Sequence, residues 1–87
     1  MALALDTVPR LWRLARLDYD PARQRSVLLY PEGAVLLNDT GLASLQLVDG
    51  SRSVAEIAAE LSRRYETDVT ADVTDYLSRL AERELIQ

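Results

Sequence analysis

The chain has 87 residues and a net charge of −4 at pH 7, a length that fits one domain and is too short for two. Cys and His are absent, and all ten basic residues are Arg. This inventory excludes disulfides, thiolate nucleophiles, Schiff-base lysines and the usual zinc ligands. We therefore expect no catalysis, no cofactor and no bound metal.

The acidic balance and the short apolar runs also limit the partners. Nucleic-acid binders usually carry a basic face, because phosphate neutralisation supplies most of their affinity. No apolar run approaches the roughly 20 residues of a membrane span. The stretch Met1–Leu5 lacks the basic leader of a secretory signal. We expect a cytoplasmic protein that binds neither nucleic acid nor membrane.

The first half of the chain predicts three β-strands. Between Leu11 and Asp20, apolar residues alternate with charged ones, which is the period of a strand with one wet face. Trp12 and Leu14 are out of phase, which predicts a bulge or a late start. Further strands are predicted at residues 26–30 and 34–37, after turns at residues 20–23 and 31–33. Short turns favour an antiparallel meander.

The second half predicts three helices. Asn38 and Asp39 are good N-cap residues for a first helix that ends at Asp49-Gly50. The second helix begins with the capping box Ser53-Val54-Ala55-Glu56 and runs to Tyr65. Thr70 is predicted to cap the third, and the last three residues to add a half-turn. The fold class is therefore α+β, a three-stranded antiparallel meander followed by three helices.

Two surfaces of this fold are candidates for binding. The third strand lies at an edge of the meander, and its residues Ala34, Val35, Leu36 and Leu37 carry no charge that would protect the edge from another chain. A peptide can pair there as a fourth strand, or the protein's own N-terminal segment can cover it. In the third helix, a stripe beside the apolar face is formed by Asp72, Tyr76, Arg79 and Arg83. This stripe is either a binding rim or a solvated face.

Two other functions remain open at this level. The second and third helices, joined by residues 66–69, are similar to a helix-turn-helix of a small DNA-binding regulator. Asp68, Asp72 and Asp75 would face phosphates in that arrangement, whereas they stabilise a helix N-terminus through its dipole. The edge strand also permits a homodimer. In each alternative the chain is non-catalytic.

Motifs spread over the chain, from about Val8 to Ile86, resemble the pyrroloquinoline quinone (PQQ) biosynthesis protein D family, PqqD. They are Pro9-Arg10-Leu11, Pro31-Glu32, Leu37-Asn38, Val48-Asp49-Gly50, Ser53-Val54-Ala55-Glu56-Ile57, Leu61, Tyr65, Asp72-Val73, Leu77 and Leu80. Each motif is common by itself, and the combination at this length is specific.

The resemblance implies a winged helix-turn-helix-like peptide chaperone, a recognition element for ribosomally made and modified peptides. It implies that the single domain of residues 1–87, with its core at about 8–86, binds the precursor peptide PqqA and presents it to the radical S-adenosylmethionine enzyme PqqE. The peptide is expected along Ala34–Leu37 and against the helix face with Asp72, Tyr76 and Arg79. Arg79 and Arg83 are predicted to contact acidic peptide residues. Recognition of a different modified peptide is the remaining alternative within the family.

Overall fold

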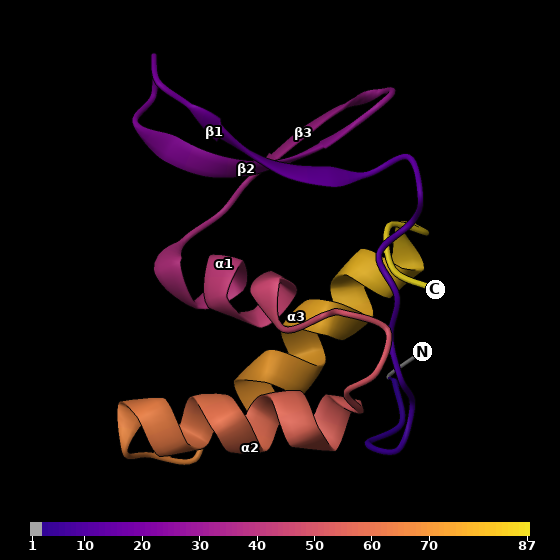
Figure 1. Cartoon of the computed structure of the whole chain (residues 1–87), viewed down its shortest axis with the longest axis vertical. Coiled ribbons are helices and arrows are strands. Elements are labelled where there is room, and N and C mark those ends of the chain that lie inside the picture. Colours follow the sequence, from indigo (N-terminus) through magenta and orange to yellow (C-terminus); the bar gives the residue numbers. More distant parts are fainter. Residues whose placement is uncertain (1–2) are drawn as a thin grey trace.

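The computed structural model describes residues 3–87 and consists of a small sheet followed by three helices (Figure 1). The first two residues of the stretch Met1–Leu5 lie outside the described part. The strands are β1 (Arg16–Asp20), β2 (Arg25–Tyr30) and β3 (Gly33–Leu36), and the helices are α1 (Asp39–Gln46), α2 (Val54–Tyr65) and α3 (Thr70–Glu82). The predicted α+β order is confirmed.

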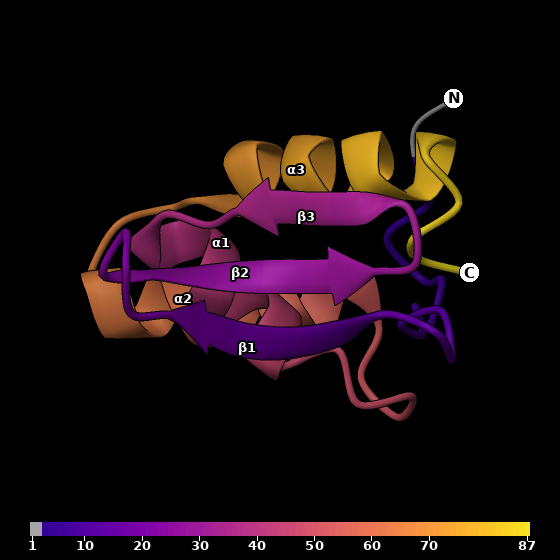
Figure 2. The same cartoon turned by 90° about the horizontal axis from the view of Figure 1, so that it is seen from above.

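The sheet has the strand order β1-β2-β3, and both pairs are antiparallel. Leu28 in the middle strand pairs with Leu17 on one side and Val35 on the other, so these three side chains share a face. Leu28 is fully buried, and all three belong to the core cluster or pack against it. The helices therefore cover this face, while no helix of residues 3–87 lies over the opposite face of the sheet (Figures 1 and 2).

Helix α2 begins as the sequence predicts. The Ser53 hydroxyl accepts a hydrogen bond from the Glu56 amide at 3.1 Å, and the Glu56 carboxylate accepts one from the Ser53 amide at 2.8 Å. This reciprocal capping satisfies two N–H groups that have no partner inside the helix. Asn38 caps α1 by accepting a hydrogen bond from the Gly41 amide at 2.7 Å.

Three local predictions are wrong: the cap of α3, the end of α1 and the half-turn at the C-terminus. Thr70 does not cap α3; the Asp68 carboxylate instead accepts a hydrogen bond from the Thr70 amide at 2.9 Å. Helix α1 ends at Gln46, before the predicted stop, and Gly50 lies in the following loop with φ +81°. There the Arg10 guanidinium approaches so closely that a Cβ at position 50 would lie 2.5 Å from it.

The C-terminal residues form no half-turn. They pair with the segment that precedes the sheet, through the Leu11–Ile86 bridge and the reciprocal backbone bonds between Arg10 and Gln87. The chain reverses at Glu84, which has φ +63°, and the Leu85 amide donates to the Leu80 carbonyl at 3.0 Å. This is a Schellman-type helix end in which a glutamate occupies the position usually held by Gly.

The core lies between the inner face of the sheet and the three helices. Its residues are Ala15, Leu28, Leu37, Leu45, Leu47, Val54, Ile57, Ala58, Leu61, Val73, Leu77, Leu80, Leu85 and Ile86. Within residues 3–87, no helix is both long enough and apolar enough to cross a bilayer.

Candidate functional site

Strand β3 is an outer edge of the sheet. Its pairing partner is β2, and within residues 3–87 no other strand pairs with it. In Figure 2, helix α3 runs alongside β3 in the layer behind the sheet. The predicted edge is therefore present, and the described N-terminal residues do not cover it, because they hydrogen-bond to the start of α2 through the carbonyls of Leu5 and Thr7.

One hydrogen bond determines which residues of β3 face this edge. The Leu37 amide donates to the Ser26 carbonyl at 2.9 Å, which makes Ser26 and Leu37 a hydrogen-bonded pair of the antiparallel ladder. Such pairs alternate with non-hydrogen-bonded ones, so Val35 and Gly33 also direct their backbone groups toward β2. Ala34 and Leu36, opposite Leu29 and Val27, consequently direct their N–H and C=O groups outward.

The side chains of β3 alternate in the same way. Val35 faces the helices and packs against the core, and Leu37, just past the strand, is buried in it. Ala34 and Leu36 lie on the opposite face, and Leu36 is 45% exposed. The four predicted residues thus fall into two groups. Ala34 and Leu36 have free backbone groups, and the side chains of Val35 and Leu37 face the core.

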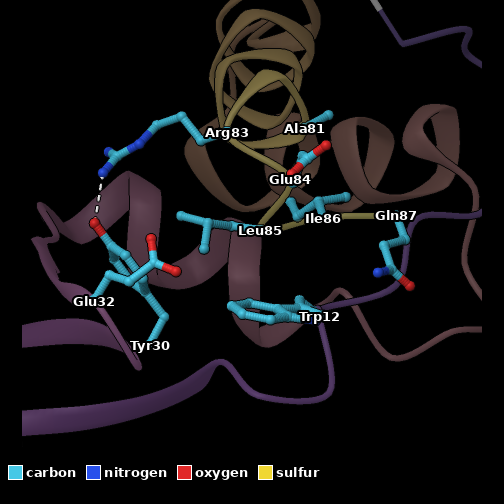
Figure 3. A pocket seen from close by; sticks show the side chains of 9 residues that line it. All are labelled: Trp12, Tyr30, Glu32, Ala81, Arg83, Glu84, Leu85, Ile86 and Gln87. Carbon is cyan, nitrogen blue, oxygen red and sulfur yellow. Dashed lines mark hydrogen bonds between the residues drawn. The ribbon is translucent and has the colours of Figure 1, made fainter.

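A single side-chain hydrogen bond connects α3 to the sheet in the described chain. The Arg83 guanidinium, just past the end of α3, donates to the Tyr30 hydroxyl at 2.8 Å and lies 5.8 Å from the centre of the ring (Figure 3). The Tyr30 ring lies beside Gly33, where a Cβ would be 3.4 Å from the hydroxyl oxygen. This Tyr30–Arg83 contact joins the start of β3 to the C-terminal end of α3.

Tyr76, in the middle of α3, lies between α3 and α1. Its hydroxyl would be 2.7 Å from a Cβ at Gly41, so the absence of a side chain there makes room for the phenol. The hydroxyl is buried and has no hydrogen-bond partner in the described structure. Burial raises the pKa of the Tyr76 phenol, because desolvation disfavours the phenolate. Tyr76 is therefore a neutral, half-buried residue that packs against the core.

The other residues of the predicted helix stripe, Asp72 and Arg79, form no hydrogen bond or ion pair with the sheet within residues 3–87. Asp72 is exposed in the first turn of α3, where the helix dipole favours its charge. Arg79 forms an ion pair with Asp75 at 2.7 Å and lines a hollow on the side of the N-terminal segment, with Leu5. Of the two predicted arginines, Arg83 is the one that contacts the sheet.

A cavity of about 550 Å³ lies at the end of the sheet where β3 begins. Figure 3 shows Leu85 above the ring of Trp12, with Tyr30, Glu32 and Arg83 on one side. The full lining is Trp12, Tyr30, Glu32, Ala81, Arg83, Glu84, Leu85, Ile86 and Gln87. It combines aromatic and aliphatic surface with charged groups, and it contains no arrangement of a nucleophile with a base.

Sequence reasoning missed Tyr30, Gly41 and the cavity. One signal was present: Arg79 has an acid four residues earlier, Asp75, whereas Arg83 has no acid three or four residues earlier. A helical arginine without such a neighbour is available for a partner elsewhere in the fold. The spacing of residues along the sequence does not predict that this partner is Tyr30, 53 residues away.

Comparison with known proteins supports the predicted resemblance. The family model for coenzyme PQQ synthesis protein D (PqqD) matches residues 25–86. The chain is similar to a PqqA binding protein from Azotobacter vinelandii, 45% identical over 85 residues that cover 95% of this chain and 92% of that protein. A bifunctional coenzyme PQQ synthesis protein C/D from Methylorubrum extorquens is 40% identical over 83 residues, covering 92% of this chain and 22% of that protein.

Among solved structures, the chain is similar to the PqqD truncation of Methylobacterium extorquens PqqCD. That solution structure is described as a functional, stand-alone recognition element for ribosomally synthesised and post-translationally modified peptides. The TM-score is 0.84 at 38% identity, and the match covers 99% of this chain and 95% of the other. These matches confirm the predicted fold and family.

Proposed function

Because this chain belongs to the PqqD family, we propose that it is a non-catalytic chaperone that binds a PqqA-type precursor peptide as a fourth strand beside β3. The proposal rests on one observation above all: the outward N–H and C=O groups of Ala34 and Leu36 have no partner in the described structure. Relatives named as PqqA binding proteins indicate the peptide. The chain would act as one recognition unit, with its core at about residues 8–86.

Strand addition explains how such a site combines affinity with selectivity. The peptide's main chain hydrogen-bonds to Ala34 and Leu36, which orients it in an extended conformation. The peptide residue opposite Val35 points toward α3 and Tyr76, and its two neighbours point toward the outer face beside Leu36. Part of the contact energy offsets the entropy lost when a flexible peptide becomes ordered.

The proposed next step is presentation of the bound peptide to a radical S-adenosylmethionine enzyme of the PqqE type. A chaperone that docks on the enzyme raises the effective concentration of the peptide at the active site. The proposal includes a cytoplasmic location, because a ribosomally made precursor first becomes available there. The fusion in Methylorubrum extorquens joins a similar domain to a PqqC part, so physical linkage to another protein of the pathway has a precedent.

Hydrogen exchange tests strand addition at the level of single amides. In the free protein, the amides of Ala34 and Leu36 should exchange fast and that of Val35 slowly, because the latter is bonded to β2. Adding a synthetic PqqA peptide to the ¹⁵N-labelled protein should protect Ala34 and Leu36 and leave Val35 nearly unchanged. Protection confined to the helices, with fast exchange persisting at Ala34 and Leu36, would contradict capture at this edge.

A second copy of the chain is an alternative occupant of the same edge, since the free groups of β3 also fit a homodimer. The two occupants compete, so sedimentation with and without PqqA peptide separates them. An edge-paired dimer should dissociate when peptide is added. A dimer that persists in saturating peptide would have to use another surface.

A further inference from the structure

The cavity lies at the end of the sheet where β3 begins, next to the edge that is proposed to bind the peptide. Apolar side chains form one part of its lining: Leu85 and Ile86 are buried there, and the rings of Trp12 and Tyr30 lie beside them (Figure 3). Glu32, directly before β3, also lines it. A strand rises about 3.3 Å per residue, so a peptide paired with Ala34 reaches this cavity about two residues later.

The charged groups at the cavity favour a cation. Its lining contains Glu32, Glu84 and Arg83, whose charges sum to −1. The guanidinium of Arg83 already contacts the Tyr30 hydroxyl and ring. Within residues 3–87 neither glutamate's carboxylate forms an ion pair or a hydrogen bond, whereas the carboxylates of Asp18 and Asp20 are paired with arginines. The two carboxylates are therefore free to accept hydrogen bonds.

We propose that this cavity is a subsite for one basic side chain, lysine or arginine, of the captured peptide. The inference rests on the proposed function and specifies the chemistry of the peptide at one position. The aliphatic stem of the side chain packs on Trp12 and Leu85, and the charged end reaches Glu32 and Glu84. An aromatic face attracts a cation in addition to the carboxylates, and a long basic side chain can bury its stem while its charge stays at the rim.

The peptide half of the test uses a synthetic PqqA peptide and versions in which each basic residue is replaced singly by norleucine. Norleucine keeps the stem and removes the charge. One replacement should lower affinity about three- to tenfold, which is the size expected for a partly exposed cation beside carboxylates and an aromatic ring. The remaining replacements should have little effect. Titration calorimetry at low salt measures each affinity.

The protein half uses Glu32→Gln and Glu84→Gln, each of which removes one carboxylate charge from the cavity. With both changes present, the sensitive norleucine replacement should no longer weaken binding. Glu66→Gln is the matched control: Glu66 has the same left-handed conformation, with φ +55°, at the end of α2, and it does not line the cavity. All three residues are exposed, so the variants should fold.

The outcomes separate this subsite from strand addition. If the unsubstituted peptide protects Ala34 and Leu36 but every norleucine version binds equally well, the subsite is refuted and strand addition stands. The same conclusion follows if the loss persists undiminished in the Glu32→Gln, Glu84→Gln protein. A peptide that does not bind at all would overturn the proposed function and the subsite together.

Discussion

The Tyr30–Arg83 contact allows a direct test of what fixes the position of α3 relative to the edge strand β3. It connects the end of β2 to the residue just past α3, at 2.8 Å between the guanidinium and the hydroxyl. We predict that Tyr30→Phe and Arg83→Gln destabilise the fold through the same lost contact. Tyr30→Phe keeps the ring beside Gly33 and removes only the hydroxyl, so it isolates the hydrogen bond from the packing.

The size of the effect follows from the exposure of the contact. A hydrogen bond to a charged group is worth about 1.5–3 kcal/mol, but this one is exposed and therefore worth less. The cation–ring contact does not enter the coupling, because Tyr30→Phe keeps the ring. We therefore expect a coupling free energy of about 0.5–1 kcal/mol between the two positions. In a domain of this size, that corresponds to a fall in Tm of about 2–8 °C for each single variant.

A double-mutant cycle measured by urea unfolding checks this prediction, with circular dichroism as the control for folding. The double variant should be little less stable than Arg83→Gln alone. Tyr30→Phe alone should weaken binding of PqqA peptide, because α3 is no longer tied to the start of β3. Strictly additive losses of stability would refute the contact. Weaker binding by Arg83→Gln with normal binding by Tyr30→Phe would mean that Arg83 contacts the peptide directly.

Five further substitutions probe the edge and the helices. Leu36→Pro removes an outward N–H and should abolish peptide capture with an unchanged circular dichroism spectrum, whereas Val35→Pro, which removes a bond to β2, should unfold the sheet. Tyr76→Phe should raise the free energy of unfolding by about 1 kcal/mol, since it deletes a buried hydroxyl without a partner; thermal melting measures this. Glu66→Gly should stabilise by about 1 kcal/mol in the same assay, because φ +55° suits glycine. Hydrogen bonds from two nearby arginines lower the pKa of Glu60 to about 2, so its contribution to stability is present above about pH 4.5 and is lost as the pH falls toward 2; Glu60→Gln should flatten that part of the stability curve.

Local signals predicted the helices well where the relevant partners are close in sequence. The capping box at Ser53 and Glu56 involves residues three apart, and the structure contains both of its hydrogen bonds. Thr70 shows the limit of the same reasoning. A threonine before an apolar run is a good cap, but Asp68 lies two residues earlier and accepts the hydrogen bond from the Thr70 amide in a tight turn.

Features that depend on pairing between distant parts of the chain could not be predicted from the local spacing of residues. The C-terminal residues looked like a helical extension, yet Ile86 pairs with Leu11, 75 positions earlier in the chain. The late start of β1, at Arg16, was one of the predicted options for the segment around Trp12 and Leu14, and the Trp12 amide bonds to the Leu85 carbonyl instead of to β2. The cavity exists because of this pairing, since Trp12 and Leu85 form part of its lining.

The orientation of the residues in β3 is a feature that the sequence alone does not predict. Meander order alone predicts that the third strand has a free side, and β3 does. It does not say which residues use that side, because a register shift of one residue exchanges the roles of all of them. The bond from the Leu37 amide to the Ser26 carbonyl resolves this choice and leaves Ala34 and Leu36 outward. A captured peptide must then place its own hydrogen-bonding residues opposite these two, so its side chains that enter the groove toward α3 come from the alternate positions.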